Sequence, residues 1–471
     1  MFDTLTRPRA LTAGLGVLAI TAGAVVLGSG GAAGASATVN PFADAGGFSV
    51  YVRGDATLDN SEIEGSLAVG GTLDAAGPGS RLSIVHKVAG TSAYTIPTID
   101  SDPTRLLVGA VAASSGIIDV SGHDGDSGLH WGFAKVITVD EPTWVFAERG
   151  GYTQYRLNQP GTESNGPVID ARNQPWATEG RASMIAAGPS VASYVENGIG
   201  VGAVSACLAE LGVSDDAHQV VVTNDGGKAR LDLTAGVVNV VDYADLYVFG
   251  STFASQITYA DDVPAADTPV VVRVAAGTTD VRGIEFGTSG EYARFVMWDL
   301  SAVTGAVTVT DKQGGMGRVD GSIFAPYAAL TLMVGPLDGQ VIADTLTTPS
   351  GAGELHAYMF SSMFTCAGAP EPTASPSPSV SPSTTPSMSP STTPGEAPGV
   401  PTSASPTASG EGEDGPTADP TATLDAGVAG PDAQTDSLAR TGANATLLAG
   451  ISLALGAVGT GILLMGSRRR A

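Results

Sequence analysis

The chain has 471 residues, a formal net charge of −25 and only 15% charged residues. This acidic balance argues against a nucleic-acid-binding surface, which needs clustered Lys and Arg, and the sequence has only four lysines: Lys87, Lys135, Lys228 and Lys312. Two cysteines are too few for a disulfide-dense scaffold or a cysteine-rich metal site.

Residues 1–37 have the pattern of a secretory signal peptide. Arg7 and Arg9 give a basic start, and Leu11 to Leu27 is an uncharged apolar run. Ala35-Ser36-Ala37 then forms an A-x-A cleavage pattern. We expect the mature chain to begin just after it, outside the cell. An uncleaved membrane anchor is the alternative, although the apolar run falls short of the ~20 residues that a span needs.

Residues 38–366 are predicted to form an all-β domain. Short runs of Val, Ile, Leu and Thr alternate with turns of Gly, Asp and Asn, which is typical of a strand-rich chain. The clearest runs are Phe48–Val52, Gln219–Val222, Val237–Val241, Leu246–Phe249, Val270–Val274 and Val303–Thr310. Strands this frequent, with little helix between them, favour a sandwich, barrel or solenoid.

A weak internal repeat favours the solenoid. The segments 64–69, 320–325 and 338–343 resemble one another, and the last two begin 18 residues apart, a plausible length for one coil. Each copy starts with an acid (Glu64, Asp320 or Asp338) and then turns the chain before alternating apolar residues enter a strand. We therefore expect a β-solenoid or β-helix-like domain, with a β-sandwich as the alternative.

One or two peripheral helices are expected beside this β body. The first would be capped by Asp102 and end at Gly116, with an apolar stripe that includes Leu106 and Leu107. The second would run from about Gly202 to Leu211. Its apolar face would hold Val204, Cys207, Leu208 and Leu211.

Three short motifs are candidate binding features. Arg53-Gly54-Asp55 is the tripeptide that integrins bind, but it lies where a strand leads into a turn, so a turn role is the alternative. Asp124 and Asp126 have the spacing of a calcium loop, yet no Glu stands at its twelfth position, which favours a solvated turn over a metal site. Thr308 and Thr310 form one T-x-T step of the kind found on ice-binding faces, and the step does not recur along the chain.

No catalytic constellation is found. The sequence lacks a G-x-S-x-G elbow, an H-E-x-x-H motif and a Walker loop, so we predict neither catalytic residues nor a cofactor. Cys207 and Cys366 would both lie outside the cell, where oxidising conditions favour a disulfide between them. Two separate thiols are the alternative.

Composition changes abruptly after Cys366. Residues 367–437 are rich in Pro, Ser, Thr, Gly and Ala and hold too little apolar surface to offset chain entropy, so we expect a disordered stalk. Leu438-Ala439-Arg440-Thr441-Gly442 follows, then an uncharged stretch over 445–465 that could cross a bilayer, then a basic tail.

This order resembles a sortase sorting signal in the L-A-x-T-G form of high-GC Gram-positive bacteria. The resemblance implies that a sortase attacks the carbonyl of Thr441 and releases Gly442 onward. An amine of a cell-wall precursor then captures the acyl-enzyme. The chain would be the substrate of this acyl transfer and would touch the membrane only through 445–465 before sorting. A permanent single-pass anchor is the alternative.

The β domain itself resembles the choice-of-anchor A family of bacterial surface proteins. The similar segments are Val52–Leu58 with Glu64–Gly71, Val296–Leu300 with Asp320–Pro326, and Gly339–Ala343 with Gly353–Tyr358. They span roughly 43–362. The resemblance implies an extracellular domain that is paired with different C-terminal anchors and has no defining catalytic residues.

We therefore predict a cell-wall-anchored, adhesin-like protein of a Gram-positive, actinobacterial-type cell. Its predicted partners are a sortase, a cell-wall precursor and an unknown extracellular ligand from a host, matrix or glycan. A structural coat protein and a carbohydrate-active enzyme on a β-helix are the alternatives.

Overall fold

The computed structural model describes residues 37–75, 80–85, 94–120, 132–139, 145–148, 154–158, 167–172, 184–213 and 216–366. Residues 1–36 of the predicted signal peptide, the stalk and the sorting signal, including Leu438–Gly442, lie outside these residues, as do Asp124 and Asp126, while the last signal-peptide residue, Ala37, begins strand β1 (Ala37–Val39). The chain divides into two compact units, Met1–Pro382 and Ser383–Ala471, and every described residue belongs to the first. None of the helices in the described ranges is long and apolar enough to span a bilayer.

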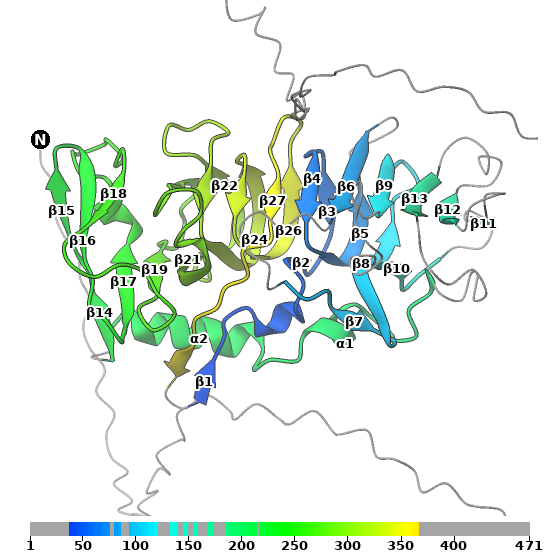
Figure 1. The fold of residues 1–471 in the computed structure, drawn as a ribbon, viewed down its shortest axis with the longest axis horizontal. Coiled ribbons are helices and arrows are strands. Elements are labelled where there is room, and N and C mark those ends of the chain that lie inside the picture. The colour runs from blue at the N-terminus through cyan, green and yellow to red at the C-terminus, as the bar shows by residue number, and fades with distance from the viewer. Residues whose placement is uncertain are drawn as a thin grey trace, which may run out of the picture. The chain divides into compact units, whose positions relative to one another are not determined.

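The first unit is a β-solenoid whose coils follow one another along the long axis in Figure 1. One face is a parallel sheet with the strand order β10-β8-β5-β2-β26-β24-β21-β19-β17-β14. These strands are β10 (Phe133–Val136), β8 (Asp102–Val111), β5 (Leu67–Asp74), β2 (Val50–Val52), β26 (Val341–Thr348), β24 (Ser322–Met333), β21 (Val296–Asp299), β19 (Val270–Arg273), β17 (Val238–Asp242) and β14 (Ala217–Gln219).

Two further faces complete the coils. One has the order β11-β12-β13-β9-β6-β4-β27-β25-β23 and is parallel from β13 onward. The other joins β20 and β22 to β3 and to the later parts of β24, β26 and β5. The bounds are β11 (Val145–Glu148), β12 (Gln154–Asn158), β13 (Pro167–Arg172), β9 (Ile117–Val120), β6 (Arg81–Val85), β4 (Glu62–Glu64), β27 (Leu355–His356), β25 (Leu337–Asp338), β23 (Val319–Asp320), β20 (Asp280–Arg282), β22 (Gly305–Thr310) and β3 (Ala56–Leu58).

The remaining elements lie at the ends and along one side. Strands β15 (Val221–Asp225), β16 (Lys228–Asp232) and β18 (Ile257–Tyr259) form a small sheet at one end, and β7 (Thr98–Ile99) pairs with β8. Strands β1 (Ala37–Val39) and β28 (Phe364–Cys366) pair antiparallel. Helix α2 (Val201–Leu211) runs beside the long sheet, preceded by α1 (Ala192–Val195), as Figure 1 shows. Short 3-10 turns cover Ala43–Ala45, Tyr243–Leu246 and Ala293–Phe295.

The chain enters this solenoid in the middle. The first long-sheet strand, β2, lies between β5, which follows it, and β26, the last strand of that sheet along the chain. From β2 the chain builds coils toward β10, passes along α2 and builds the other half from β14 back toward β26. The two halves therefore close on each other at β2 and β26.

Two apolar layers hold the long sheet. Val296 and Trp298 of β21 point into the solenoid core, and Met297 between them packs into the layer beneath α2. Val204, Cys207 and Leu208 of the helix lie in that second layer. Because both faces of the sheet are covered, its strands are nearly continuous runs of apolar residues.

The predicted all-β solenoid is confirmed, and so is the helix expected over 202–211. The 18-residue repeat is confirmed as well, because Ile323 pairs in register with Val341 and Asp320 with Asp338. Parallel ladders, rather than the antiparallel ladders of the alternative β-sandwich, connect these coils.

Two predicted elements are wrong. The segment predicted as a helix from Asp102 is strand β8, because Leu106 and Val108 face the solenoid core while Leu107 faces the second apolar layer on the other side of the sheet. Its closely spaced apolar residues serve two faces of a strand. The strand predicted over Leu246–Phe249 is also absent: the chain ends a 3-10 turn at Leu246, and Phe249 pairs only with Thr252 around Gly250, whose φ is 56°.

Candidate functional site

One solenoid face carries rows of threonine across neighbouring coils. Thr308 pairs with Thr331, Thr331 with Thr347, and Thr347 with Thr57. We call the outward side of β22, β3 and the later parts of β24, β26 and β5 the threonine face. Thr57 and Thr347 are exposed, and Thr308 and Thr331 are half-buried.

A second row of small residues runs beside the first. Ala306, Ala329 and Thr345 are neighbours on three successive strands, two residues before the threonines of the first row. Neighbouring strands lie about 4.8 Å apart, and outward residues of one strand lie about 6.6 Å apart. The two rows therefore form a grid of methyl and hydroxyl groups with a regular spacing in both directions.

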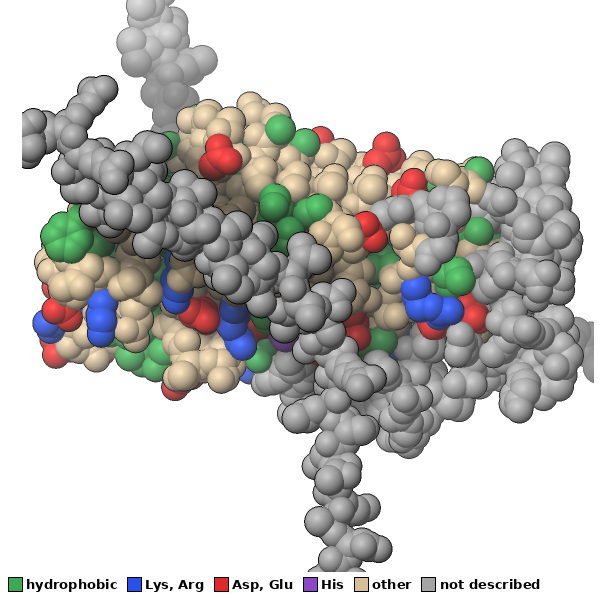
Figure 2. Space-filling model, turned by 90° about the horizontal axis from the view of Figure 1, so that it is seen from above, with side chains coloured by type: hydrophobic (Ala, Val, Ile, Leu, Met, Phe, Trp, Pro, Cys, Tyr) green, Lys and Arg blue, Asp and Glu red, His purple; other side chains and the backbone are tan. Residues whose placement is uncertain are grey.

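The residues between these rows make the face rigid. Val307, Leu330 and Leu346 alternate with the outward residues and lie buried in the solenoid core at 1% exposure each. Charged groups lie at the margins of the threonine row, where Asp280 pairs with Thr308 and Asp74 with Thr57. Figure 2 shows the side of the molecule away from α2: in its upper part scattered acidic side chains lie among uncharged atoms, and in its lower part side chains of both signs lie together.

These rows change how the single T-x-T step is interpreted. Thr308 and Thr310 do not begin a repeat along the chain. Instead, Thr308 belongs to a row whose other members come from coils of unequal length, and one of them, Thr57, comes from the far end of the domain sequence. The recurrence lies across the sheet, where sequence spacing does not reveal it.

A second face carries a buried column of ionisable residues. Asp320, Asp338 and His356 are consecutive neighbours on β23, β25 and β27, and the pairing of Leu355 with Ile63 places Glu64 next in line. We call these four residues the polar column. They are between 0% and 8% exposed.

Arg318 and the column residues hold one another in place. The Arg318 guanidinium forms ion pairs with Asp320 and with Asp338. Nδ1 of His356 lies 2.6 Å from Oδ1 of Asp338, and Nε2 lies 3.0 Å from Oε2 of Glu354. Burial raises the pKa of the Asp320 carboxyl above its ordinary value, while the Phe286 N–H and Arg318 oppose that rise.

Sequence reasoning found part of this column. Glu64, Asp320 and Asp338 were expected as turn acids of the repeat, and the structure buries all three. His356 was missed, although it follows Asp338 by the same 18 residues and so occupies the same place in the next coil. The repeat spacing was the signal that could have found it.

The Arg53-Gly54-Asp55 tripeptide forms the turn between β2 and β3. Arg53 pairs with Glu196 at 3.3 Å and donates to the backbone oxygen of Pro326 at 3.2 Å. Asp55 accepts a hydrogen bond from the backbone N–H of Thr72 at 2.7 Å. All these contacts lie within the domain, so the two charged side chains fasten the turn to other segments of the chain.

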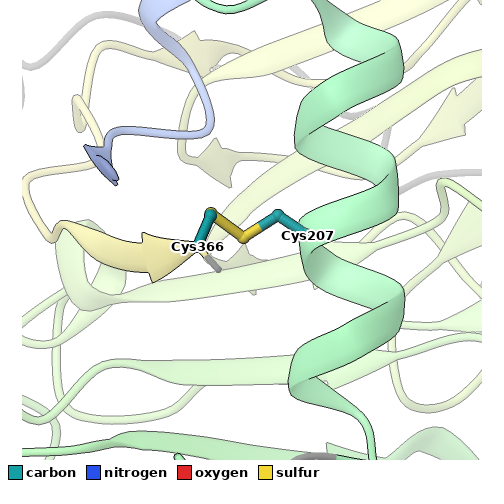
Figure 3. The surroundings of a disulfide bond; sticks show 2 residues. All are labelled: Cys207 and Cys366. Atoms are coloured by element: carbon teal, nitrogen blue, oxygen red, sulfur yellow. A yellow bond between two sulfur atoms is a disulfide. The ribbon is translucent and has the colours of Figure 1, made fainter. Parts of the chain in front are cut away.

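Cys207 and Cys366 are joined by a disulfide bond (Figure 3). Cys207 lies on α2 and Cys366 at the end of β28, with their Cα atoms 5.4 Å apart. Both cysteines are nearly buried. The bond therefore ties the last described strand to the helix that runs along the solenoid.

One comparison with known proteins found a family. A family model described as "Putative Ice-binding-like adhesive domain" matches residues 41–357. This range is close to the 43–362 of the choice-of-anchor A resemblance, under a different description. No curated protein and no solved structure matches the chain. The match supports an adhesin-like surface protein with an extracellular location.

Proposed function

The chain belongs to the ice-binding-like adhesive domain family, and we propose that it is an adhesin that binds its extracellular ligand through the threonine face. The observation that carries this proposal is the row of Thr308, Thr331, Thr347 and Thr57 over a fully packed core. Since the grid repeats in two directions, it suits a ligand with its own regular repeat. A polysaccharide surface, rich in hydroxyl groups, is the ligand class we favour.

Rigidity supports this role. A preorganised face loses little conformational entropy when it binds, so more of the contact energy appears as affinity. The threonine hydroxyls can donate and accept hydrogen bonds, and their methyl groups can pack against apolar patches of sugar rings. The uncharged centre also avoids the desolvation of ions on contact.

Binding is tested with the exported chain without its sorting signal, residues 38–437. Thr331→Lys and Thr347→Lys each place a long charged side chain in the centre of the threonine face, and Thr223→Lys makes the same change at an exposed site on β15. On a polysaccharide panel, the two face variants should bind at least about tenfold more weakly than the wild type, a loss of about 1.4 kcal/mol. Equal binding by all three variants would contradict the proposal.

The same panel separates the alternatives. Binding to ice crystals and not to polysaccharide would leave the threonine face as the proposed binding surface and make ice its ligand. Release of reducing or unsaturated sugar ends would indicate a carbohydrate-active enzyme. An absence of binding to every surface would favour a structural coat protein.

We further propose that a sortase anchors the protein to a Gram-positive cell wall, as in the choice-of-anchor A arrangement. The support is the order of Leu438–Gly442, the apolar stretch 445–465 and the basic tail. In this reaction the chain is the substrate and not the catalyst. Deletion of Leu438–Gly442 should leave the protein in the membrane or release it to the medium. Unchanged covalent linkage to the wall would refute this anchoring.

A further inference from the structure

We propose that Glu64, Glu354 and His356 form a binding site for a divalent transition-metal ion, with Zn²⁺ as the fitting occupant. One ligand atom from each residue, two carboxylate oxygens and a ring nitrogen, lies within 4.8 Å of the other two. This proposal rests on the polar column and is independent of the threonine face.

The ligand geometry is close to what Zn²⁺ requires. Zn²⁺ binds His nitrogen at about 2.0 Å and Glu oxygen at about 2.1 Å, so tetrahedral ligands lie about 3.4 Å from one another. Glu354 and His356 are two residues apart near β27, and Glu64 ends the neighbouring strand β4. Since the Glu354 side chain is 44% exposed, it can move the short distance that closes the site.

The histidine is already oriented for metal binding. Its Nδ1 lies 2.6 Å from Asp338, which can accept the Nδ1–H and leave Nε2 as the ligand atom. A carboxylate behind a ligating histidine fixes the ring and raises its basicity. Arg318 in turn holds that carboxylate through its ion pair with Asp338.

Charge supports a bound cation. The polar column and its neighbours bring together the carboxyl groups of Asp320, Asp338, Glu64 and Glu354. Arg318 forms ion pairs with two of them, Asp320 and Asp338. A divalent cation placed among these carboxylates would be attracted by their negative charge. The imidazole ligand favours Zn²⁺ and other transition metals over Ca²⁺ or Mg²⁺, which prefer oxygen.

The site lies where the two halves of the solenoid meet. Glu64 belongs to the N-terminal half, and Glu354 and His356 belong to the last coil of the C-terminal half. A metal ion held by all three would join strands β4 and β27 across this junction. Binding should therefore stabilise the folded chain, because the unfolded chain does not bring these residues together.

The test uses the full chain after removal of metals with a chelator. Isothermal titration with Zn²⁺ should show one tight site per chain, and Zn²⁺ should raise the thermal midpoint of the wild type. Glu354→Gln removes one ligand from a half-exposed position and should weaken Zn²⁺ binding at least about tenfold. Glu285→Gln is the matched control, since Glu285 is 37% exposed and pairs with Lys312 outside the site.

The outcomes are distinct. The proposal holds if Zn²⁺ stabilises the wild type and Glu285→Gln equally and stabilises Glu354→Gln much less, while Ca²⁺ has no such effect. It fails if the wild type binds no Zn²⁺ with a defined stoichiometry. It also fails if Glu354→Gln responds like the wild type, because binding would then lie elsewhere.

Discussion

Val341 pairs in register with Val50, although nearly the whole β domain separates them in the sequence. The first and last strands of the long sheet are therefore neighbours at the middle of the solenoid. An ordinary solenoid adds coils from one end, and each coil contacts only its neighbours in sequence. Here the coils on either side of the junction depend on contacts between distant parts of the chain, which are slow to form.

The close approach of consecutive coils predicts that a side chain at position 339, now Gly339, destabilises the fold. A Cβ atom at Gly339 would lie 2.2 Å from the backbone oxygen of Gly321 in the preceding coil. Gly339→Ala should lower the free energy of unfolding by about 2 kcal/mol or more, because backbone must shift. Gly202→Ala is the control: Gly202 lies in the first turn of α2 with its nearest neighbour at 3.6 Å, and the change should stabilise the protein by about 0.4–1 kcal/mol. Urea unfolding of both variants measures these changes in the free energy of unfolding. Similar changes in the two variants would show that contact between coils does not cause the destabilisation.

The alternation along β24 predicts opposite sensitivities at adjacent positions. Leu330 points into the core at 1% exposure, and Thr331 points out on the threonine face. Leu330→Ala should cost about 2–5 kcal/mol through lost burial and the cavity that remains. Thr331→Ala should change stability by no more than about 0.5 kcal/mol. Denaturant titrations measure the free energy of unfolding of both variants. A large loss of that free energy in Thr331→Ala would mean that the threonine face contributes to stability of the fold.

The Cys207–Cys366 disulfide should contribute strongly to stability. The two cysteines are 159 residues apart, and on the chain-entropy model closing a loop of that size stabilises the fold by up to about 5 kcal/mol. The double variant Cys207→Ala/Cys366→Ala should therefore unfold at a lower urea concentration. A reducing agent should destabilise the wild type toward the variant and leave the variant unchanged. An identical midpoint for oxidised and reduced wild type would refute the prediction.

Asp44 predicts a particular dependence of stability on pH. It is 1% exposed, accepts a hydrogen bond from the Gly198 N–H, and lies near Glu196 and Arg53. Burial raises the pKa of its carboxyl above the ordinary 3.8. A folded-state pKa above the unfolded value means that the wild type loses stability as pH rises from 3.8 through the folded pKa.

Asp44→Asn keeps the acceptor oxygen and cannot ionise. The variant should be more stable than the wild type at pH 7, and its advantage should shrink as the pH falls to 3.8 and below. Thermal midpoints across this range test the sign. An advantage that is equal at both pH values would mean that ionisation of Asp44 does not limit stability.

The sequence was sufficient for the architecture where a regular spacing existed. The acids at Asp320 and Asp338 mark one coil each, and the register of Ile323 with Val341 follows from them. It was insufficient at β8, where a strand buried on both faces has the same dense apolar pattern as a helix. A dense apolar pattern shows that the residues of a segment are buried. It does not show whether one face of the segment or both faces are covered.

The candidate sites were predictable to different degrees. The polar column could be predicted from the sequence, because Asp320, Asp338 and His356 follow one another at a constant spacing of 18 residues. The threonine row could not, because its strands come from coils of different lengths and from both halves of the chain. Glu64 reaches His356 only through the junction of β4 with β27, and no local pattern encodes that junction.

The disulfide between Cys207 and Cys366 also affects how a mechanical force on the chain enters the domain. If the protein is tethered through the segment after Cys366, any pull between a bound surface and the cell enters the domain at the end of β28. Strand β28 is held to β1 by three residue pairs, one of which involves Ala37, the last residue of the predicted signal peptide, and such a short strand would separate under steady force. The bond to Cys207 passes that pull to α2, which lies along the solenoid, so the force is shared among many coils before any strand separates.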